Sequence, residues 1–461
     1  MVSRTFDVVN PATEDVIESV EDHSVADAMA ALARVEAAQR SWRTVPPRVK
    51  AEVLRSVFEA MIAKRTELAE LIVAENGKSR GDALAEVGYA AEFFRWFSEE
   101  AVRIEGSIAT SPSGDKRIIV LHQPTGVALL VTPWNFPIAM AARKIAPALA
   151  AGCGVVLKPA PETPLSALAM GRICIDAGVP AGLVELVPTS EAAEVVGALL
   201  ADDRVRVLSF TGSTEVGRIL LRAAANRVVN TSMELGGNAP VVVCADASIE
   251  DAVEGALVAK MRNGGAACTA ANRFYVHTKV AAEFTDALVQ RMQKLVVGPG
   301  TDPANDVGPL VSAAERDKVA DLVSAAIADG AVLAAGGEAR PERGFYVRPT
   351  VLASVQPQAS ILKTEIFGPV APIVTFDDED EAVALANQGP AGLIAYVFTQ
   401  DLARGLNISE RLEAGMVGLN RGVVSDPAAP FGGWKQSGIG REGGHVGIHE
   451  FLETKYIAAH W

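Results

Sequence analysis

The chain has 461 residues, of which 49% are hydrophobic and 21% are charged, and its formal net charge is -14. This length predicts two or three domains, and the composition is typical of a well-packed globular protein rather than a disordered or fibrous one. The acidic charge argues against general binding to nucleic acid or to an anionic membrane. An anionic substrate would therefore need a basic pocket of its own.

Apolar and polar residues alternate in two short strands near the N-terminus, at about 6–9 and 15–20, on either side of the turn Asn10-Pro11-Ala12-Thr13. Three helices follow at about 25–42, 47–75 and 80–104, where apolar residues recur every three or four positions. The segment Lys116 to His122 has strand character with polar ends. Together these elements predict a helical flank that leads into a sheet domain.

Beyond residue 125, short apolar strands alternate with helices. The expected strands are 126–131, 154–157, 184–187 and 205–210, and the expected helices are 138–151, 164–177, 191–201 and 215–226. The pattern begins again with strands at 240–244, 274–277, 350–353, 371–376 and 394–398, and helices at 248–262, 279–293, 313–328 and 379–388. Such alternation predicts two parallel, doubly wound sheets, which bind ligands beyond the carboxyl ends of their strands.

Cysteine usage and the absence of long apolar runs bear on location. The spacings of the four cysteines fit neither a disulfide framework nor a zinc site: Cys153, Cys174, Cys244 and Cys268. The N-terminal residues have no apolar signal core, and the longest nearly apolar run, Ile145 to Leu157, is shorter than the roughly 20 residues of a membrane span. We therefore expect a cytoplasmic protein that binds no metal and no membrane.

Cys268 stands in a segment of small residues, Asn-Gly-Gly-Ala-Ala-Cys-Thr-Ala-Ala, at 263–271. Small neighbours leave room for a flat molecule to come within bonding distance of the sulfur, which favours a reaction site. Buried cysteine also serves as a small hydrophobic residue. On this segment alone, the catalytic and the structural interpretation stay equally open.

Two further segments end buried strands. Asn135 lies between Pro133 and Pro137, and a rigid amide there can donate to an oxyanion, whose loss typically costs ~10²–10³ in rate. Lys158 follows a strand, where its ammonium suits a phosphate or a ribose. Alternatively, Asn135 only caps the next helix, and Lys158 is a solvated charge.

Four more segments join glycine to polar or aromatic residues. Gly212 and Ser213 open a helix, where free amides and the helix dipole favour a pyrophosphate. Glu234 stands just before two glycines, and such a carboxylate can act as a base toward water if its pKa is raised. Glu365 could accept hydrogen bonds from a ribose, and residues 430–433 could wall a narrow slot. Each could equally be a plain turn.

In this order, the motifs and the cysteine segment resemble the aldehyde dehydrogenase superfamily, from residues 10–13 to residues 435–442. The resemblance implies an α/β fold with two doubly wound parallel-sheet domains and a small β oligomerisation arm. It implies that Cys268 is the nucleophile, that Asn135 and the Cys268 backbone amide form an oxyanion hole, and that Glu234 is the general base. It also implies the following dinucleotide-binding residues: Trp134, Lys158, Gly212, Ser213, Leu235, Glu365 and Phe367.

Within the superfamily, the chain is similar to succinate-semialdehyde dehydrogenases, which oxidise an aldehyde bearing a distal carboxylate. Arg143, Arg262 and Ser425 match that subgroup's substrate-carboxylate residues. Two guanidinium groups in the active site of an acidic protein would select such a substrate. Without the resemblance, Arg143 would be a charge on a helix surface and Arg262 a cation at a helix C-terminus.

Two positions depart from the pattern of relatives. Ala270 stands where some relatives have a second cysteine, so a disulfide switch with Cys268 is absent. Pro161 stands where NAD-preferring relatives often have glutamate, and Glu162 follows it. Because Pro161 can neither repel a 2′-phosphate nor bind a ribose hydroxyl, the cofactor can be NAD or NADP, and we favour NADP slightly.

The resemblance also implies a domain plan. Residues 1–112 and 125–235 would form the dinucleotide-binding domain, residues 236–434 the catalytic domain, and residues 113–124 and 435–461 the oligomerisation arm of a homodimer or homotetramer. The alternatives are specificity for glutarate semialdehyde or a neutral aliphatic aldehyde, a coenzyme-A-acylating reaction, and a non-catalytic binding protein on the same fold. Glu234 argues against acylation, because a base that activates water would compete with coenzyme A for the thioester.

Overall fold

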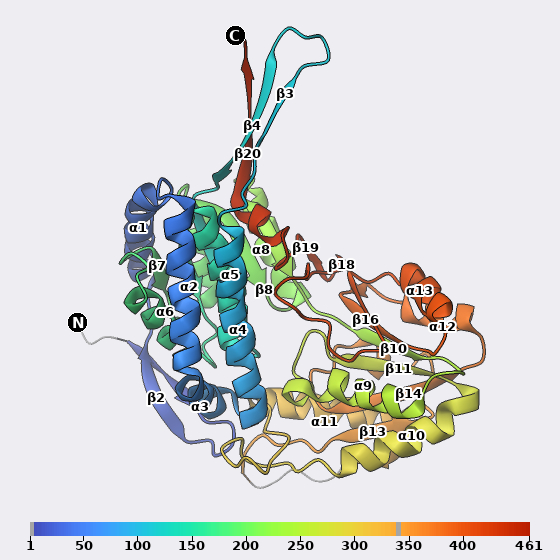
Figure 1. Ribbon diagram of the computed structural model, residues 1–461. Helices are drawn as coiled ribbons and strands as arrows, with labels where there is room; N and C mark the ends of the chain where they lie inside the picture. The colour runs from blue at the N-terminus through green and yellow to red at the C-terminus, as the bar shows by residue number, and fades with distance from the viewer. Residues whose placement is uncertain (1–3, 338–342) are drawn as a thin grey trace.

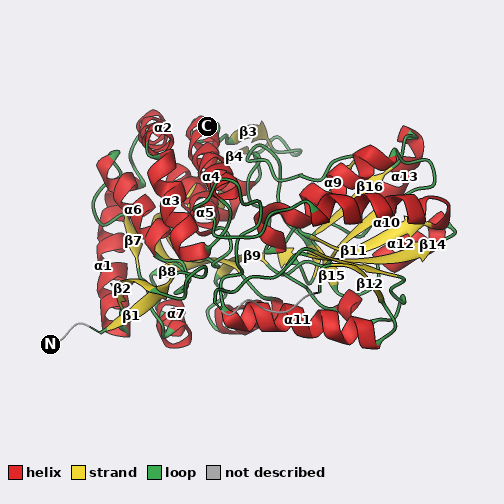
Figure 2. Cartoon of the chain, turned by 90° about the horizontal axis from the view of Figure 1, so that it is seen from below, coloured by secondary structure: helices red, strands yellow, loops and turns green. Residues whose placement is uncertain are grey.

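The computed structural model describes residues 4–337 and 343–461. Two lobes lie side by side, and a narrow three-stranded sheet projects away from both (Figure 1). Each lobe is built on one main sheet that is covered by helices on both faces, as the view from below shows (Figure 2). The predicted fold class is therefore confirmed. Among the described residues, no helix is both long and apolar enough to cross a membrane.

The sheet of the first lobe has the strand order β19-β9-β8-β5-β6-β7 and is parallel except for β19 at its edge. Its strands are β5 (Val127–Val131), β6 (Gly154–Lys158), β7 (Val184–Leu186), β8 (Val205–Thr211), β9 (Asn230–Glu234) and β19 (Gly438–Ile439). A separate hairpin is formed by β1 (Thr5–Val9) and β2 (Val16–Glu21).

Alternate residues of the central strands pack into two cores. Ala128 and Leu130 face one core with α2 (Pro47–Ala63), α3 (Arg65–Asn76), α4 (Arg80–Glu100), α5 (Pro137–Ala151) and α6 (Leu165–Asp176). Val127 and Leu129 face the other with α1 (Val25–Trp42), α7 (Ala192–Ala201) and α8 (Thr214–Ala225). This alternation is the period of two that a strand buried on both faces requires.

The sheet of the second lobe has the order β12-β13-β14-β11-β10-β16-β17, with β12 antiparallel at one edge. Its strands are β10 (Ala239–Val243), β11 (Ala271–His277), β12 (Val332–Ala335), β13 (Thr350–Ala353), β14 (Val370–Phe376), β16 (Ile394–Phe398) and β17 (Met416–Leu419). One face is covered by α9 (Ile249–Met261) and α10 (Thr278–Gln293), the other by α11 (Ala313–Ala328), α12 (Glu379–Ala386) and α13 (Leu402–Arg411). Short pieces complete the lobe: η1 (Arg262–Gly265), η2 (Ser360–Lys363), β15 (Ala391–Gly392) and β18 (Trp434–Lys435).

The projecting sheet joins β3 (Ser107–Thr110), β4 (Arg117–Pro124) and β20 (Leu452–Ala459) (Figure 1). Strand β20 pairs antiparallel with β4 along its whole length, and η3 (Gly447–Phe451) leads into it. Its apolar side chains are unusually open to solvent: Ile108 is 71% exposed and Tyr456 is 53% exposed. Exposed apolar edges of this kind are a liability unless another surface covers them.

One predicted helix is wrong. The helix expected over 47–75 is two helices, because Lys64 leaves the helical path with φ -100° and ψ 17° and α3 starts at the next residue. Four strands of the main sheets, β9, β12, β17 and β19, and the helix α13 were not predicted from the sequence. The other expected elements lie within a few residues of the observed ones.

Candidate active site

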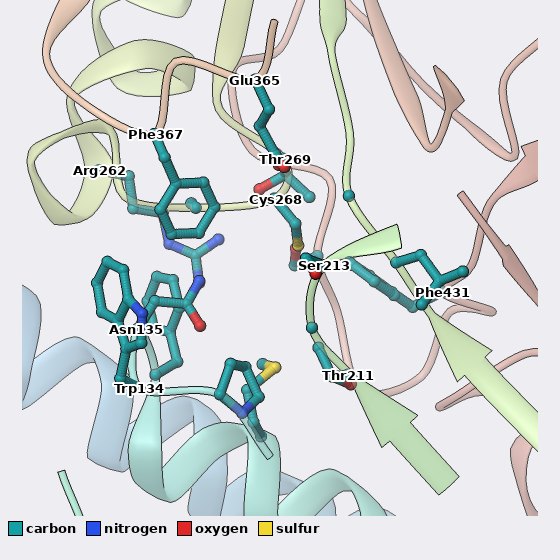
Figure 3. A pocket seen from close by; sticks show the side chains of 18 of the residues that line it. Trp134, Asn135, Thr211, Ser213, Arg262, Cys268, Thr269, Glu365, Phe367 and Phe431 are labelled. Atoms are coloured by element: carbon teal, nitrogen blue, oxygen red, sulfur yellow. The ribbon is translucent and has the colours of Figure 1, made fainter. Parts of the chain in front are cut away.

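A cavity of about 210 Å³ is lined by residues of both lobes. Figure 3 shows several of these side chains around one space, with Asn135 and Trp134 from the first lobe and Cys268, Arg262 and Phe367 from the second. Of the predicted site residues, all but Glu234 and Lys158 line this cavity: Trp134, Asn135, Arg143, Gly212, Ser213, Leu235, Arg262, Cys268, Glu365, Phe367 and Ser425.

Cys268 lies between η1 and β11, and it is the only described cysteine that is not fully buried. The loop that carries it packs tightly, since a Cβ added to Gly237 would come within 2.3 Å of the Cys268 carbonyl oxygen. Burial raises the pKa of the Cys268 thiol to about 12, and the nearby Arg143 charge opposes this shift. The resting group is therefore a thiol, and it needs a base before it can attack.

Asn135 lies in the loop between β5 and the start of α5, and its side chain is buried. Its Nδ2 donates to the Ala266 carbonyl oxygen at 3.2 Å, while its Oδ1 has no hydrogen-bond partner within the part of the chain that the structure describes. An amide group has two N–H donors, so one stays available for a ligand. The structure thus places an amide donor on the same cavity as the thiol.

Glu234 ends β9, and the pairing of β19 with β9 sets Gly438 opposite it. Both carboxylate oxygens are buried and have no hydrogen-bond partner among the described residues. Burial raises the pKa of Glu234 well above its ordinary value, and the negative charge of Glu442 raises it further. Glu234 is not among the residues that line the cavity. Its carboxylate still lies close enough to Cys268 for its charge to raise the pKa of the thiol.

Arg143 and Lys144 are both buried on α5 and share one acidic partner, Glu442. Arg143 Nε lies 2.6 Å from Glu442 Oε2, and Lys144 Nζ lies 2.5 Å from Glu442 Oε1. The Arg143 guanidinium also stacks 3.9 Å from the centre of the Phe431 ring. Arg143 is thus an interior group that faces the cavity, not a charge on the helix surface.

Arg262 is half-buried and faces the cavity between two aromatic rings, with its guanidinium carbon 4.9 Å from the centre of Phe136 and 5.7 Å from that of Tyr89. Within residues 4–337 and 343–461, it forms no ion pair. Its guanidinium is thus free of close carboxylate contacts in the described chain. It still lies near the buried Asp82, whose pKa is raised by burial, a shift that the charges of Lys78 and Arg262 oppose. Ser425 lines the same cavity.

The other end of the cavity is formed by the N-terminus of α8 and the loop around Glu365. Ser213 caps α8 by accepting from Val216 N at 3.3 Å, and Glu365 Oε1 accepts from Gly237 N at 3.0 Å. Burial raises the pKa of Glu365 to about 7. Trp134 and Phe367 meet edge to face, with ring centres 5.3 Å apart, and so form a wall across the two lobes.

This arrangement gathers a thiol, an amide donor and a carboxylate of raised pKa from three distant segments. The chain also matches the description "Aldehyde dehydrogenase family" over residues 1–457. The chain belongs to the aldehyde dehydrogenase family, as its motifs predicted, and its expected class, an NAD(P)-dependent oxidoreductase, is confirmed.

The curated relatives include a succinate-semialdehyde dehydrogenase of Paenarthrobacter nicotinovorans, which is 52% identical over 94% of this chain and 96% of the relative. A succinate-semialdehyde dehydrogenase of Escherichia coli (strain K12), whose name specifies NADP(+), is 44% identical over 98% of this chain and 94% of the relative. The solved structure of an E. coli NADP-dependent enzyme matches with a TM-score of 0.97 and 44% identity. The match covers 99% of this chain and 94% of the chain in that structure.

Sequence reasoning missed Glu442, although a signal was present. Arg143 and Lys144 stand side by side in an otherwise apolar helix, and buried charges are normally paired. That rule predicts an acidic partner from elsewhere in the chain. It does not say which one, because Glu442 is 298 residues away from Lys144.

Lys158 was predicted to meet a ligand, and the structure places it at the buried end of β6, outside the lining of the cavity. Two exposed apolar side chains of α8 were not predicted as site residues. Val216 is 44% exposed and Ile219 is 59% exposed, one and two turns from Ser213. Exposed apolar groups beside a helix N-terminus offer a surface for a flat, partly apolar ligand.

Proposed function

We propose that this chain oxidises succinate semialdehyde to succinate with NADP or NAD as the hydride acceptor. The observation that carries the proposal is the Arg262 guanidinium, which forms no ion pair within the described residues and faces the cavity that also holds Cys268 and Asn135. A distal carboxylate on the substrate would meet that charge and Ser425, while its aldehyde carbon meets the thiol. The names of the curated relatives agree with this substrate.

In the proposed mechanism, Glu234 takes the proton of Cys268 directly or through water, and the thiolate adds to the aldehyde carbon. The new oxyanion accepts hydrogen bonds from Asn135 Nδ2 and from the Cys268 backbone amide. A bound dinucleotide supplies the hydride acceptor, and loss of hydride leaves a thioester on Cys268. Glu234 passes the proton it has taken to solvent and then removes a proton from water, which adds to the thioester. Collapse releases the acid, and the departing thiolate takes a proton back from Glu234 to restore the thiol.

The residues present fit a dinucleotide. The first turn of α8 offers backbone N–H groups that a helix leaves unpaired, which suit a pyrophosphate. Val216 and Ile219 provide an exposed apolar surface for an adenine ring, and Glu365 provides an acceptor for ribose hydroxyls. Burial lowers the pKa of Lys158, yet its ammonium at the end of β6 still suits a ribose or phosphate near this cleft. Trp134, Gly212, Ser213, Leu235 and Phe367 would complete the site.

NADP is our slight preference over NAD. Pro161 follows the end of β6 and cannot repel a 2′-phosphate, and two curated relatives carry NADP(+) in their names. A related structure from Bacillus cereus, 36% identical with a TM-score of 0.96, is described as an NAD+ complex. Rates with each cofactor would decide between them.

A glutarate-semialdehyde dehydrogenase is the second candidate, because a relative with that name from Pseudomonas aeruginosa is 44% identical over 98% of this chain and 94% of its own. Glutarate semialdehyde is longer by one methylene group, so the distance from Arg262 to Cys268 decides which acid fits. A hydrophobic pocket discriminates one methylene group by only about 1–3 kcal/mol.

The test is a substrate panel followed by absorbance of the reduced nicotinamide. We expect a higher kcat/KM for succinate semialdehyde than for glutarate semialdehyde, and a much higher one than for butanal, which has the same chain length without the carboxylate. A protein equally active on butanal would be a general aldehyde dehydrogenase. A Cys268→Ala variant as active as the parent would overturn the mechanism, and faster turnover in the presence of coenzyme A would indicate acylation.

We also propose that subunits pair through the projecting sheet, as its exposed Ile108 and Tyr456 suggest. A homodimer or homotetramer would cover these side chains.

We also propose a division into a dinucleotide-binding domain (1–112 and 125–235), a catalytic domain (236–434) and an arm (113–124 and 435–461). In support, the two main sheets fall on either side of residue 235 except for the short edge strand β19. The cytoplasmic location stays a prediction.

A further inference from the structure

The side-chain amide of Asn263 joins the two segments that carry the proposed oxyanion donor and the nucleophile. Its Nδ2 donates to the Asn135 carbonyl oxygen at 2.8 Å and to the Ala266 carbonyl oxygen at 2.9 Å. The Ala266 carbonyl oxygen also accepts from Asn135 Nδ2 at 3.2 Å. Two of these hydrogen bonds therefore tie the loop of Asn135 to the segment that precedes Cys268, and the third holds that segment to itself.

Residues at and just before the start of α4 form hydrogen bonds with both Asn135 and Asn263. Lys78 Nζ donates to the Asn135 carbonyl oxygen at 2.7 Å and pairs with Glu86 at 2.5 Å, with both side chains fully buried. Asp82 Oδ2 accepts from the backbone N–H of Asn263 at 3.1 Å. The Asn135 carbonyl oxygen thus accepts two hydrogen bonds, one from each lobe.

Asn263 combines two properties that few residues share. Its backbone is in the left-handed region, with φ 54°, where asparagine is tolerated far better than most residues. Its side chain is buried and uses both hydrogens of its amide on main-chain oxygens. Glycine would satisfy the first requirement alone, which makes the two roles separable by mutation.

We propose that Asn263 is a positioning residue that sets the separation and angle between the Asn135 amide and the Cys268 sulfur. This inference rests on the proposed function, because it requires Asn135 to stabilise the oxyanion. We assign Asn263 no contact with substrate or cofactor, because it lies outside the lining of the cavity and its amide donates to two main-chain oxygens. It acts on the reaction through Asn135.

The expected loss of kcat can be estimated from the typical cost of losing or misplacing an oxyanion donor. Removing an oxyanion donor outright typically costs ~10²–10³ in kcat, and a misplacement of ~1 Å can cost ~10²-fold. Without Asn263, the Asn135 loop keeps the hydrogen bond from Lys78, so the donor is loosened rather than lost. We therefore expect Asn263→Gly to lower kcat roughly tenfold, with KM changed far less.

A double-mutant cycle tests the proposal. Steady-state rates on succinate semialdehyde are measured for the parent, Asn263→Gly, Asn135→Ala and the double variant. If Asn263 acts through Asn135, the glycine substitution costs roughly tenfold in the parent and less than about twofold in the Asn135→Ala background. The rate of Cys268 alkylation by iodoacetamide should be the same in Asn263→Gly and the parent, because the thiol keeps its environment.

Asn420 offers a matched control. It also has φ 54° and donates from Nδ2 to a backbone carbonyl, that of Thr399 at 2.9 Å, but it lies in the second lobe away from the cavity. Asn420→Gly should leave kcat at the parent value. If Asn263→Gly shows no cooperative unfolding, Asn263→Asp is measured in its place. Aspartate keeps the shape of the side chain and the left-handed backbone but has no amide donor.

The outcomes separate two failures. If Asn135→Ala itself leaves kcat unchanged, the proposed mechanism is wrong. If Asn135→Ala lowers kcat but the two substitutions multiply independently, or if Asn263→Gly slows alkylation as much as turnover, Asn263 does not act through the oxyanion donor and the inference is overturned.

Discussion

Arg262 and Arg143 both face the cavity, but the structure gives them different electrostatic surroundings. Glu442 already compensates Arg143, whereas no carboxylate of the described chain pairs with Arg262. We therefore predict that Arg262→Met removes most of the selectivity for a carboxylated aldehyde. Methionine keeps an apolar stem near Phe136 and Tyr89 and removes only the charge and its donors.

A hydrogen bond to a charged group contributes about 1.5–3 kcal/mol, and each 1.36 kcal/mol corresponds to a factor of ten. Arg262→Met should thus lower kcat/KM for succinate semialdehyde roughly 10- to 150-fold. The value for butanal should stay within about twofold, because that substrate has no carboxylate to lose. Arg143→Met serves as the comparison and should cost less selectivity but more thermal stability, since it removes a buried partner of Glu442. Equal losses on both aldehydes for Arg262→Met would refute the reasoning.

Three further predictions concern the Glu234 carboxylate, the buried Lys260 and the projecting sheet. Glu234→Gln should lower kcat ~10²–10⁴-fold and give no burst of reduced nicotinamide, because Cys268 loses the base that takes its proton before hydride transfer and the thioester loses the base that activates water. In the parent, kcat should rise with pH through the raised pKa of Glu234, and a profile unchanged in the variant would exclude this base. Lys260 is fully buried, and burial lowers its pKa from 10.5 to about 7, so the unfolded chain binds more protons than the folded one between these values. The free energy of unfolding should therefore rise with pH from 7 to 10 by at most about 1.4 kcal/mol per unit from this group, and a urea titration should show a smaller rise for Lys260→Met. Tyr456→Asp on the exposed arm should shift the oligomer toward smaller species in sedimentation, and an unchanged mass would argue against pairing through this sheet.

The sequence predicted the features that depend on local pattern. Apolar strands alternating with helices predicted most of both main sheets, and the order of short motifs identified the family and half of the residues that line the cavity. Prediction failed where structure comes from distant partners. Strand β9 reads Asn-Thr-Ser-Met-Glu, which has weak strand character, and it is a strand because β8 and β19 pair with it.

Helix α13 could have been predicted. Asp401 precedes it and accepts from the backbone N–H groups of Ala403 and Arg404, as an N-cap residue does. By contrast, nothing local predicts that Glu442 neutralises Arg143, or that Asn263 contacts the Asn135 loop. The first contact depends on the return of the C-terminal segment to the first lobe, and the second depends on the docking of one lobe on the other; no periodicity of the sequence encodes either.

The shared partner of Arg143 and Lys144 has a consequence for how the protein is made. Glu442 lies 298 residues after Lys144, beyond the whole second lobe, so α5 emerges from the ribosome with two cations and no anion to meet them. A first lobe that closed early would seal both charges in its interior, which is strongly unfavourable. We therefore expect native packing around α5 to follow the synthesis of the second lobe, so that the thiol would gain its finished surroundings only after nearly all of the chain is available.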